Sequence, residues 1–107
     1  MQTATCLRIY LSESDCIDGE PAAEAILALC RDAGLQSVSV IRAMEGLGAH
    51  GIHSTSFLSL SSGLPLMIEA IAEDTNIQHA LTQLQTRIPQ ATIATWQVQL
   101  IQQGTPS

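Results

Sequence analysis

Hydrophobic and polar residues alternate with a period of two near both ends of the chain. Leu7, Ile9 and Leu11 are separated by polar residues, which predicts a strand over residues 6–12 with one apolar face. Residues 93–101 alternate in the same way, and they predict a last strand before a polar tail at 102–107.

Two other stretches have the spacing of helices. Apolar residues within 26–33 mark one helical face and predict a first helix over residues 21–33. Pro21 suits a first helical position, and Gly34 suits the position where a helix stops.

The second helix follows the same logic. Ile77, Leu81 and Leu84 form an apolar stripe that Pro89 ends, and the segment 75–78 has the pattern of a capping box at its start.

The remaining apolar runs predict two further strands. Residues 38–44 are rich in β-branched side chains, and residues 54–60 begin a return strand that is interrupted near 61–63. Residues 66–72 are its stronger half. Both the odd-numbered and the even-numbered positions of this stretch are apolar, so both faces of the strand should be covered. We expect helices to cover one face and a second subunit to cover the other.

This order of elements is strand, helix, strand, strand, helix, strand. It predicts a ferredoxin-like βαββαβ fold of the α+β class, with an antiparallel sheet. At 107 residues the chain corresponds to a single domain, 1–107.

Composition excludes several function classes. The net charge is −6 and all four basic residues are arginines, so the chain would repel a phosphate backbone, and nucleic acid is a poor partner. Charged residues make up only 13% and apolar ones 46%, which favours burial of some apolar surface between subunits.

Localisation and thiol chemistry follow from what the sequence lacks. No window is apolar enough to insert in a membrane, and the N-terminus has no signal-peptide pattern, so we expect a cytoplasmic protein.

Cys6, Cys16 and Cys30 are odd in number and fit neither a disulfide framework nor a structural zinc site. We expect reduced thiols, with Cys16 in a polar loop as the one to test for reactivity.

A glycine-rich segment follows the second predicted strand. It runs from Arg42 to His53 and includes Gly46, Gly48 and Gly51. Glycine permits positive φ and close approach of the backbone, which suits a ligand or partner site and also an ordinary irregular turn.

These residues, in this order, resemble the PII-like family known as number 190 of the domains of unknown function. The resemblance spans residues 5–102. The segments that carry it are LRIYLSESD (7–15), AGL (33–35), VIR (40–42), EGLG (45–48), IH (52–53) and LP (64–65).

The resemblance implies a homotrimer related to the PII signalling proteins, which bind effectors in clefts between subunits. It also implies a partner loop between strands two and three, at about 46–57. That loop contains Ala49, His50, Gly51, Ile52 and His53.

The implied effector site begins at Gly46-Leu47-Gly48, which is similar to the loop base beside the nucleotide phosphates in PII proteins. Consecutive amides in such a turn can bind an anion. The other phosphate-binding residues of PII proteins are mostly missing, so AMP or ADP fits better than ATP. The effector-binding candidates are Arg8, Arg42, Glu45, Gly46, Leu47, Gly48, Ser61, Ser62 and Arg87.

Structural roles remain open for several of these residues. Arg42 could instead brace the fold by pairing with Glu45 or Glu69, and Arg8 could form an ion pair between subunits. Ser61 and Ser62 also fit ordinary loop composition.

Three function classes follow. The first is a trimeric regulatory protein that binds an adenine nucleotide, with bicarbonate as a further effector, and controls a transporter or metabolic enzyme through the partner loop. The second is a copper-tolerance-like metal-binding trimer that uses His50 and His53, and the same topology also suits an interaction scaffold without a ligand. The third is an enzyme. No catalytic motif supports it, so we predict no enzymatic activity and no cofactor other than the nucleotide effector.

Overall fold

A computed structural model describes residues 2–42 and 65–102 of the protein. Its main sheet has four strands: β1 (Gln2–Ser12), β4 (Val38–Arg42), β5 (Pro65–Ala72) and β6 (Thr92–Leu100). The strand order is β4-β5-β1-β6, and all neighbours are antiparallel. The predicted ferredoxin-like α+β fold is confirmed.

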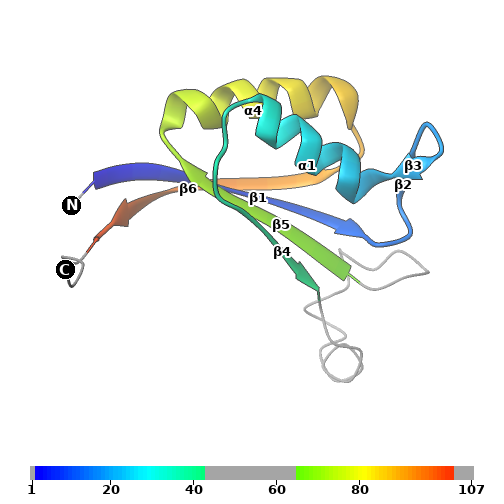
Figure 1. Cartoon of the computed structure of the whole chain (residues 1–107), viewed down its shortest axis with the longest axis horizontal. Helices are drawn as coiled ribbons and strands as arrows, with labels where there is room; N and C mark the ends of the chain where they lie inside the picture. Colours follow the sequence, from blue (N-terminus) through cyan, green and yellow to red (C-terminus); the bar gives the residue numbers. More distant parts are fainter. Residues whose placement is uncertain (1, 43–64, 103–107) are drawn as a thin grey trace.

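The two described helices lie together on one face of this sheet (Figure 1). They are α1 (Ala22–Asp32) and α4 (Asp74–Arg87). The core fills the space between the two layers, where Leu7, Ile9 and Leu84 are fully buried. Their burial follows from the period of β1, because every second side chain of a strand points to the same face.

Neither described helix lies over the other face of the sheet (Figure 1). Paired residues of neighbouring strands point to the same side, so the register assigns the side chains of this open face. We define the open face as Cys6, Arg8, Tyr10, Ile41, Met67, Glu69, Ile71 and Trp96. Ile41 is 38% exposed and Trp96 is 41% exposed, so the face presents large apolar groups to solvent.

The loop after β1 contains a hairpin that the sequence analysis missed. It consists of β2 (Cys16–Ile17) and β3 (Glu20–Pro21). Asp18 has φ 52° and Gly19 has φ 82°, and positive φ at both central residues is the signature of a type I′ turn. The Asp-Gly pair was the available signal.

Helix boundaries differ slightly from prediction. Pro21 ends β3 and precedes α1 instead of being its first residue, so α1 begins at Ala22. The predicted capping box at the start of α4 is wrong, because Thr75 lies inside the helix and Glu73 is the N-cap. Asp74 stabilises this helix start instead: its Oδ1 accepts hydrogen bonds from Thr5 Oγ1 at 2.9 Å and from Gln78 Nε2 at 3.4 Å.

Strand predictions are largely confirmed. β1 starts at Gln2 and not at residue 6, since its first residues pair with the end of β6. The stretch 65–72 is a strand, as expected for the stronger half of the return segment. The predicted strand residues 43–44 and 54–60 lie outside the described part. No helix of the described ranges is long and apolar enough to cross a membrane.

Gly34 ends α1 in a Schellman motif. Its N–H donates to Arg31 O, and Leu35 N–H donates to Cys30 O, both at 3.0 Å. Gly34 has φ 89°, and Leu35 is buried beside the helix end, as the motif requires.

We therefore expect Gly34→Ala to lower the free energy of unfolding by about 1–2 kcal/mol, because a Cβ disfavours positive φ. No backbone atom within 4 Å would meet that Cβ, so the cost is conformational. Urea denaturation measures it. Gly34→Asn is the control and should lose less, since Asn tolerates this conformation; equal stability of Gly34→Ala and wild type would contradict the assignment.

The three cysteines differ in accessibility. Cys16 is exposed in the hairpin, whereas Cys6 and Cys30 are buried. Burial raises the pKa of Cys30 to about 11, and burial together with the nearby Glu69 carboxylate raises the pKa of Cys6.

Because the thiolate is the reactive form, a raised pKa lowers reactivity at every pH below it. A maleimide at pH 8 should therefore label Cys16 quickly and leave Cys6 and Cys30 largely unlabelled in the native protein. Mass spectrometry of the labelled peptides, with all three labelled in denaturant, checks this. Rapid labelling of a Cys16→Ser variant under native conditions would show the prediction to be wrong.

Candidate functional site

The predicted effector and partner loop joins the sheet at one end. Arg42 is the last residue of β4 and Pro65 the first of β5, and Arg42 pairs with Leu66 while Ser12 pairs with Pro65. The ends of β4 and β1 and the start of β5 therefore lie together at the root of this loop (Figure 1). We call this place the loop root. The candidate residues 45–53, 61 and 62 themselves lie outside the described ranges.

Arg42 makes an ion pair at the loop root with Glu13, a partner that the sequence analysis did not name, and Glu45, one of the two predicted partners, lies outside the described ranges. Its Nη1 lies 3.7 Å from Glu13 Oε2, and the two side chains are 61% and 36% exposed. Glu69 cannot serve as the partner because the register places it on the open face, whereas Arg42 shares the helix side of the sheet with Leu66. An exposed pair of this length contributes little to stability, so the Arg42 guanidinium can be engaged by a ligand at low cost.

Glu13 is held in place by a compact turn after β1. The Ser12 N–H donates to Asp15 Oδ2 at 3.0 Å, and Asp15 N–H donates back to Ser12 O at 3.0 Å. Asp15 O in turn accepts a 2.8 Å hydrogen bond from Ala22 N–H at the start of α1. The turn 12–15 thus fixes the backbone at the end of β1 and before α1, and Glu13, whose carboxylate faces Arg42, lies within it.

Arg8 lies on the open face and is already paired. Its Nε donates to Glu69 Oε2 at 2.9 Å, a second guanidinium nitrogen contacts the same oxygen, and the guanidinium carbon lies 5.3 Å from the centre of the Trp96 ring. The hydrogen bond to Glu69, and then that to Tyr10, raise the pKa of Arg8. Arg8 therefore forms an ion pair within its own chain, and the expected pair between subunits stays a prediction.

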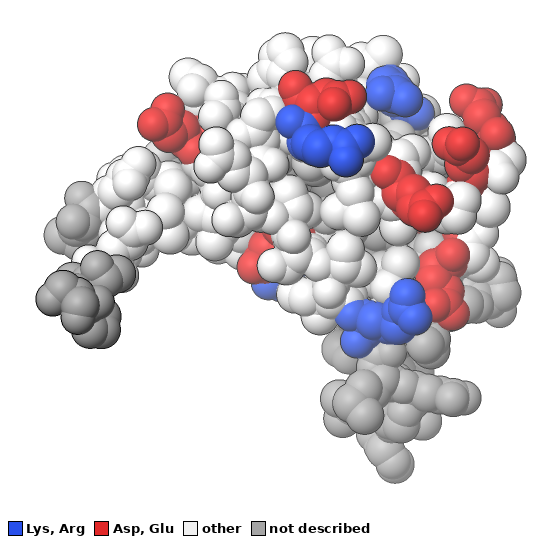
Figure 2. Space-filling model, viewed as in Figure 1, with Lys and Arg blue, Asp and Glu red and all other residues white. Residues whose placement is uncertain are grey.

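Arg87 lies in the last turn of α4 and is exposed. The structure thus places the three arginine candidates apart: Arg8 on the open face, Arg42 at the β4 edge and Arg87 in the helix layer. Figure 2 shows no cluster of basic side chains on the face that it presents. One described chain by itself does not assemble the cationic site that a triphosphate needs.

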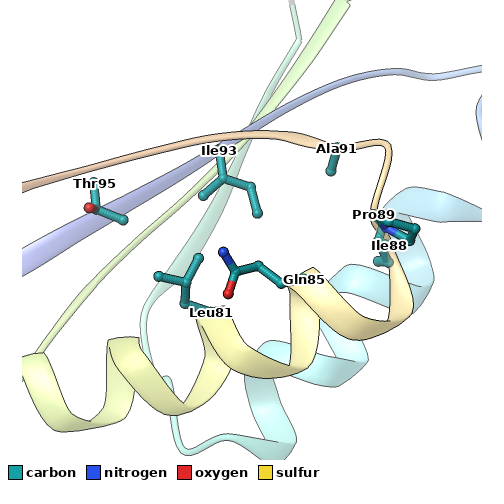
Figure 3. A pocket seen from close by; sticks show the side chains of 7 residues that line it. All are labelled: Leu81, Gln85, Ile88, Pro89, Ala91, Ile93 and Thr95. Carbon is teal, nitrogen blue, oxygen red and sulfur yellow. The ribbon is translucent and has the colours of Figure 1, made fainter.

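A groove between α4 and β6 is the feature that the sequence analysis missed (Figure 3). It encloses about 460 Å³. Its lining residues are Leu81, Gln85, Ile88, Pro89, Ala91, Ile93 and Thr95. Along the chain these residues belong to a helix, a turn and a strand. They form one surface only because α4 packs beside β6.

Metal binding has no support within the described ranges 2–42 and 65–102, because no group of three or more His, Cys, Asp or Glu side chains there could hold an ion. His50 and His53, the ligands of the metal hypothesis, lie outside those ranges.

Solved structures with the same fold are PII-like proteins. The chain is similar to CPII of Thiomonas intermedia K12 bound to ADP, AMP and acetate, with a TM-score of 0.66 and 16% identity over 94% of this chain and 90% of that one. It is also similar to CPII bound to ADP and bicarbonate, with a TM-score of 0.64 and 18% identity over 92% and 89% of the two chains. These likenesses establish a PII-like fold.

Two relatives are closer in sequence. The UPF0166 protein MJ1524 of Methanocaldococcus jannaschii is 31% identical over 84 residues, which are 78% of each chain. A UPF0166 protein of Aquifex aeolicus is 32% identical over 79 residues, covering 73% of this chain and 75% of that protein.

The resemblance noted in the sequence is confirmed by a family model that matches residues 4–100. The matched residues include both described helices and every described strand except the first two residues of β1. The chain belongs to the DUF190 family, whose description is Uncharacterized ACR, COG1993.

Proposed function

We propose that this protein is a PII-like regulatory trimer that binds AMP or ADP, together with bicarbonate, in clefts between its subunits. It controls a partner transporter or enzyme through the loop 46–57 and works in the cytoplasm without catalysing a reaction. The observation that carries this proposal is the shared fold, over more than nine-tenths of the chain, with CPII proteins bound to ADP, AMP and bicarbonate.

The distribution of charge supports the choice of nucleotide. The chain has ten acidic and four basic residues, and the described arginines are dispersed. A triphosphate carries about four negative charges at neutral pH and needs several cations or a metal to offset them. AMP and ADP carry fewer, so they suit a site in which Arg42 and backbone amides supply most of the attraction.

The open face supports assembly into a trimer. Monomeric proteins rarely leave large contiguous apolar surfaces in water, and this face exposes Ile41 and Trp96 beside partly buried Met67 and Ile71. The Arg8–Glu69 pair at its centre is already neutralised within the chain, so burying it against other subunits leaves no unpaired charge.

The loop root supplies the regulatory link. Among the described residues, a ligand that contacts Arg42 competes with Glu13, and Arg42 leads directly into the loop. If one loop arrangement binds the ligand more tightly, ligand binding shifts the loop toward that arrangement and changes the affinity for a partner.

Isothermal titration calorimetry tests the effector. We expect saturable AMP and ADP binding with dissociation constants on the order of micromolar, near −8 kcal/mol, and weaker binding of ATP, each measured with and without Mg²⁺ and bicarbonate. Arg42→Gln should weaken AMP binding roughly tenfold, because it removes a charge-assisted hydrogen bond. Arg31→Gln, an exposed arginine of α1, is the matched control and should change nothing. The absence of binding by wild type would refute the proposed effector.

Light scattering tests the assembly. Wild type should have the mass of three chains, and Trp96→Glu should have the mass of one, because a carboxylate would be buried in the open face. Gln83→Glu adds the same charge to the exposed side of α4 and should remain trimeric. Circular dichroism confirms folding. A Trp96→Glu variant that stays trimeric would exclude this face as the interface.

A further inference from the structure

We infer that Glu13 limits the negative charge of the effector: its carboxylate, which faces Arg42 at the loop root, repels the additional phosphates of ATP. This inference rests on the proposed function and deepens it, because it names a residue that selects among adenine nucleotides. Arg42 supplies attraction for a phosphate, and Glu13 supplies the repulsion that sets how many phosphates are tolerated.

The ion pair between Glu13 and Arg42 is open enough for an anion to enter. Glu13 Oε2 lies 3.7 Å from Arg42 Nη1, which is longer than the roughly 2.7–2.9 Å of a charge-assisted hydrogen bond. The Arg42 side chain is 61% exposed. A phosphate from solvent can therefore approach the guanidinium, and it then lies beside the carboxylate.

The backbone on both sides of Glu13 is fixed, so its charge stays near Arg42 when the ion pair opens. Ser12 N–H donates to Asp15 Oδ2, and Asp15 N–H donates to Ser12 O, both at 3.0 Å, which closes the turn around Glu13. Asp15 O accepts a 2.8 Å hydrogen bond from Ala22 N–H, which anchors this turn to the start of α1. Rotation of the Glu13 side chain can break the pair, but the carboxylate remains within the roughly 8 Å over which charges act at physiological ionic strength.

The carboxylate is not offset by a second cation among the described residues. Arg42 is the one described cation within ion-pair distance of Glu13, and the other three arginines belong to the open face and to the last turns of α1 and α4. The pair of Glu13 and Arg42 has no net charge, so a first phosphate is attracted only through its closer approach to the guanidinium. Each further phosphate adds negative charge near the carboxylate without meeting a new cation there.

A carboxylate beside an arginine can also act as a brace that positions it. If Glu13 only held the Arg42 guanidinium in place, its removal would weaken the binding of all nucleotides to a similar degree. If Glu13 repels phosphates, its removal strengthens binding, and the gain is largest for the nucleotide with the most phosphates. The two roles therefore predict changes of opposite sign.

Calorimetry of Glu13→Gln distinguishes these roles, because glutamine keeps the length of the side chain and removes its charge. Without Mg²⁺ and at low salt, we expect AMP binding to strengthen roughly twofold and ATP binding roughly tenfold. The ratio of the ATP affinity to the AMP affinity should therefore rise about fivefold. High salt should reduce this rise, since it screens the repulsion.

Two control variants separate the position of the charge from its amount. Glu20→Gln removes the same charge at an exposed position of β3 and should leave the affinity ratio unchanged. Glu13→Asp keeps the charge on the same backbone and should keep the preference of wild type for AMP over ATP. Circular dichroism and thermal midpoints equal to those of wild type exclude misfolding as a cause of any change.

Failure of this inference is distinguishable from failure of the proposed function. If wild type binds AMP or ADP and Glu13→Gln has an unchanged affinity ratio, or binds all three nucleotides more weakly, only the repulsive role of Glu13 is wrong. If neither wild type nor Glu13→Gln binds AMP, ADP or ATP, both are wrong.

Discussion

The position of β1 in the middle of the sheet is the constraint on which the rest of the structure depends. β1 pairs with β5 on one side and β6 on the other, so its alternation assigns the side chains of three strands to two faces. Odd-numbered residues such as Leu7 and Ile9 build the core under the helices, and Arg8 belongs to the open face. A shift of one residue would exchange the faces and bury the arginine in the core.

The same parity explains why the architecture was predictable and its polar contacts were not. Alternation in β1 and β6 and the apolar stripe of α4 identify the elements and their order directly from sequence. The partner of Arg42 depends on which face each strand position occupies once the sheet has formed, and that register separates Arg42 from Glu69. Likewise, Asp74 at the start of α4 accepts a hydrogen bond from Thr5, which is 69 positions away in the chain, and no local capping pattern reveals such a contact.

The candidate site shows a similar division. The arginines were recognisable as the few cations of an acidic chain, but their dispersal over two faces and a helix appears only in three dimensions. The groove could not be read from the sequence because its residues each satisfy a simpler local role. Ile88 completes the core, Pro89 ends a helix and Ile93 belongs to a strand, while Gln85 is one of several polar residues on an exposed helix.

Under the proposed function, the separation of charge from apolar surface would give assembly a direct role in ligand binding. The uncharged groove lies at one edge of the sheet, beside β6, and Arg42 lies at the other, at the end of β4. A neighbouring subunit in a ring would bring the two halves together. In the proposed trimer, a ligand in such a cleft would join one subunit to the loop root of the next and would couple its binding to the partner loop.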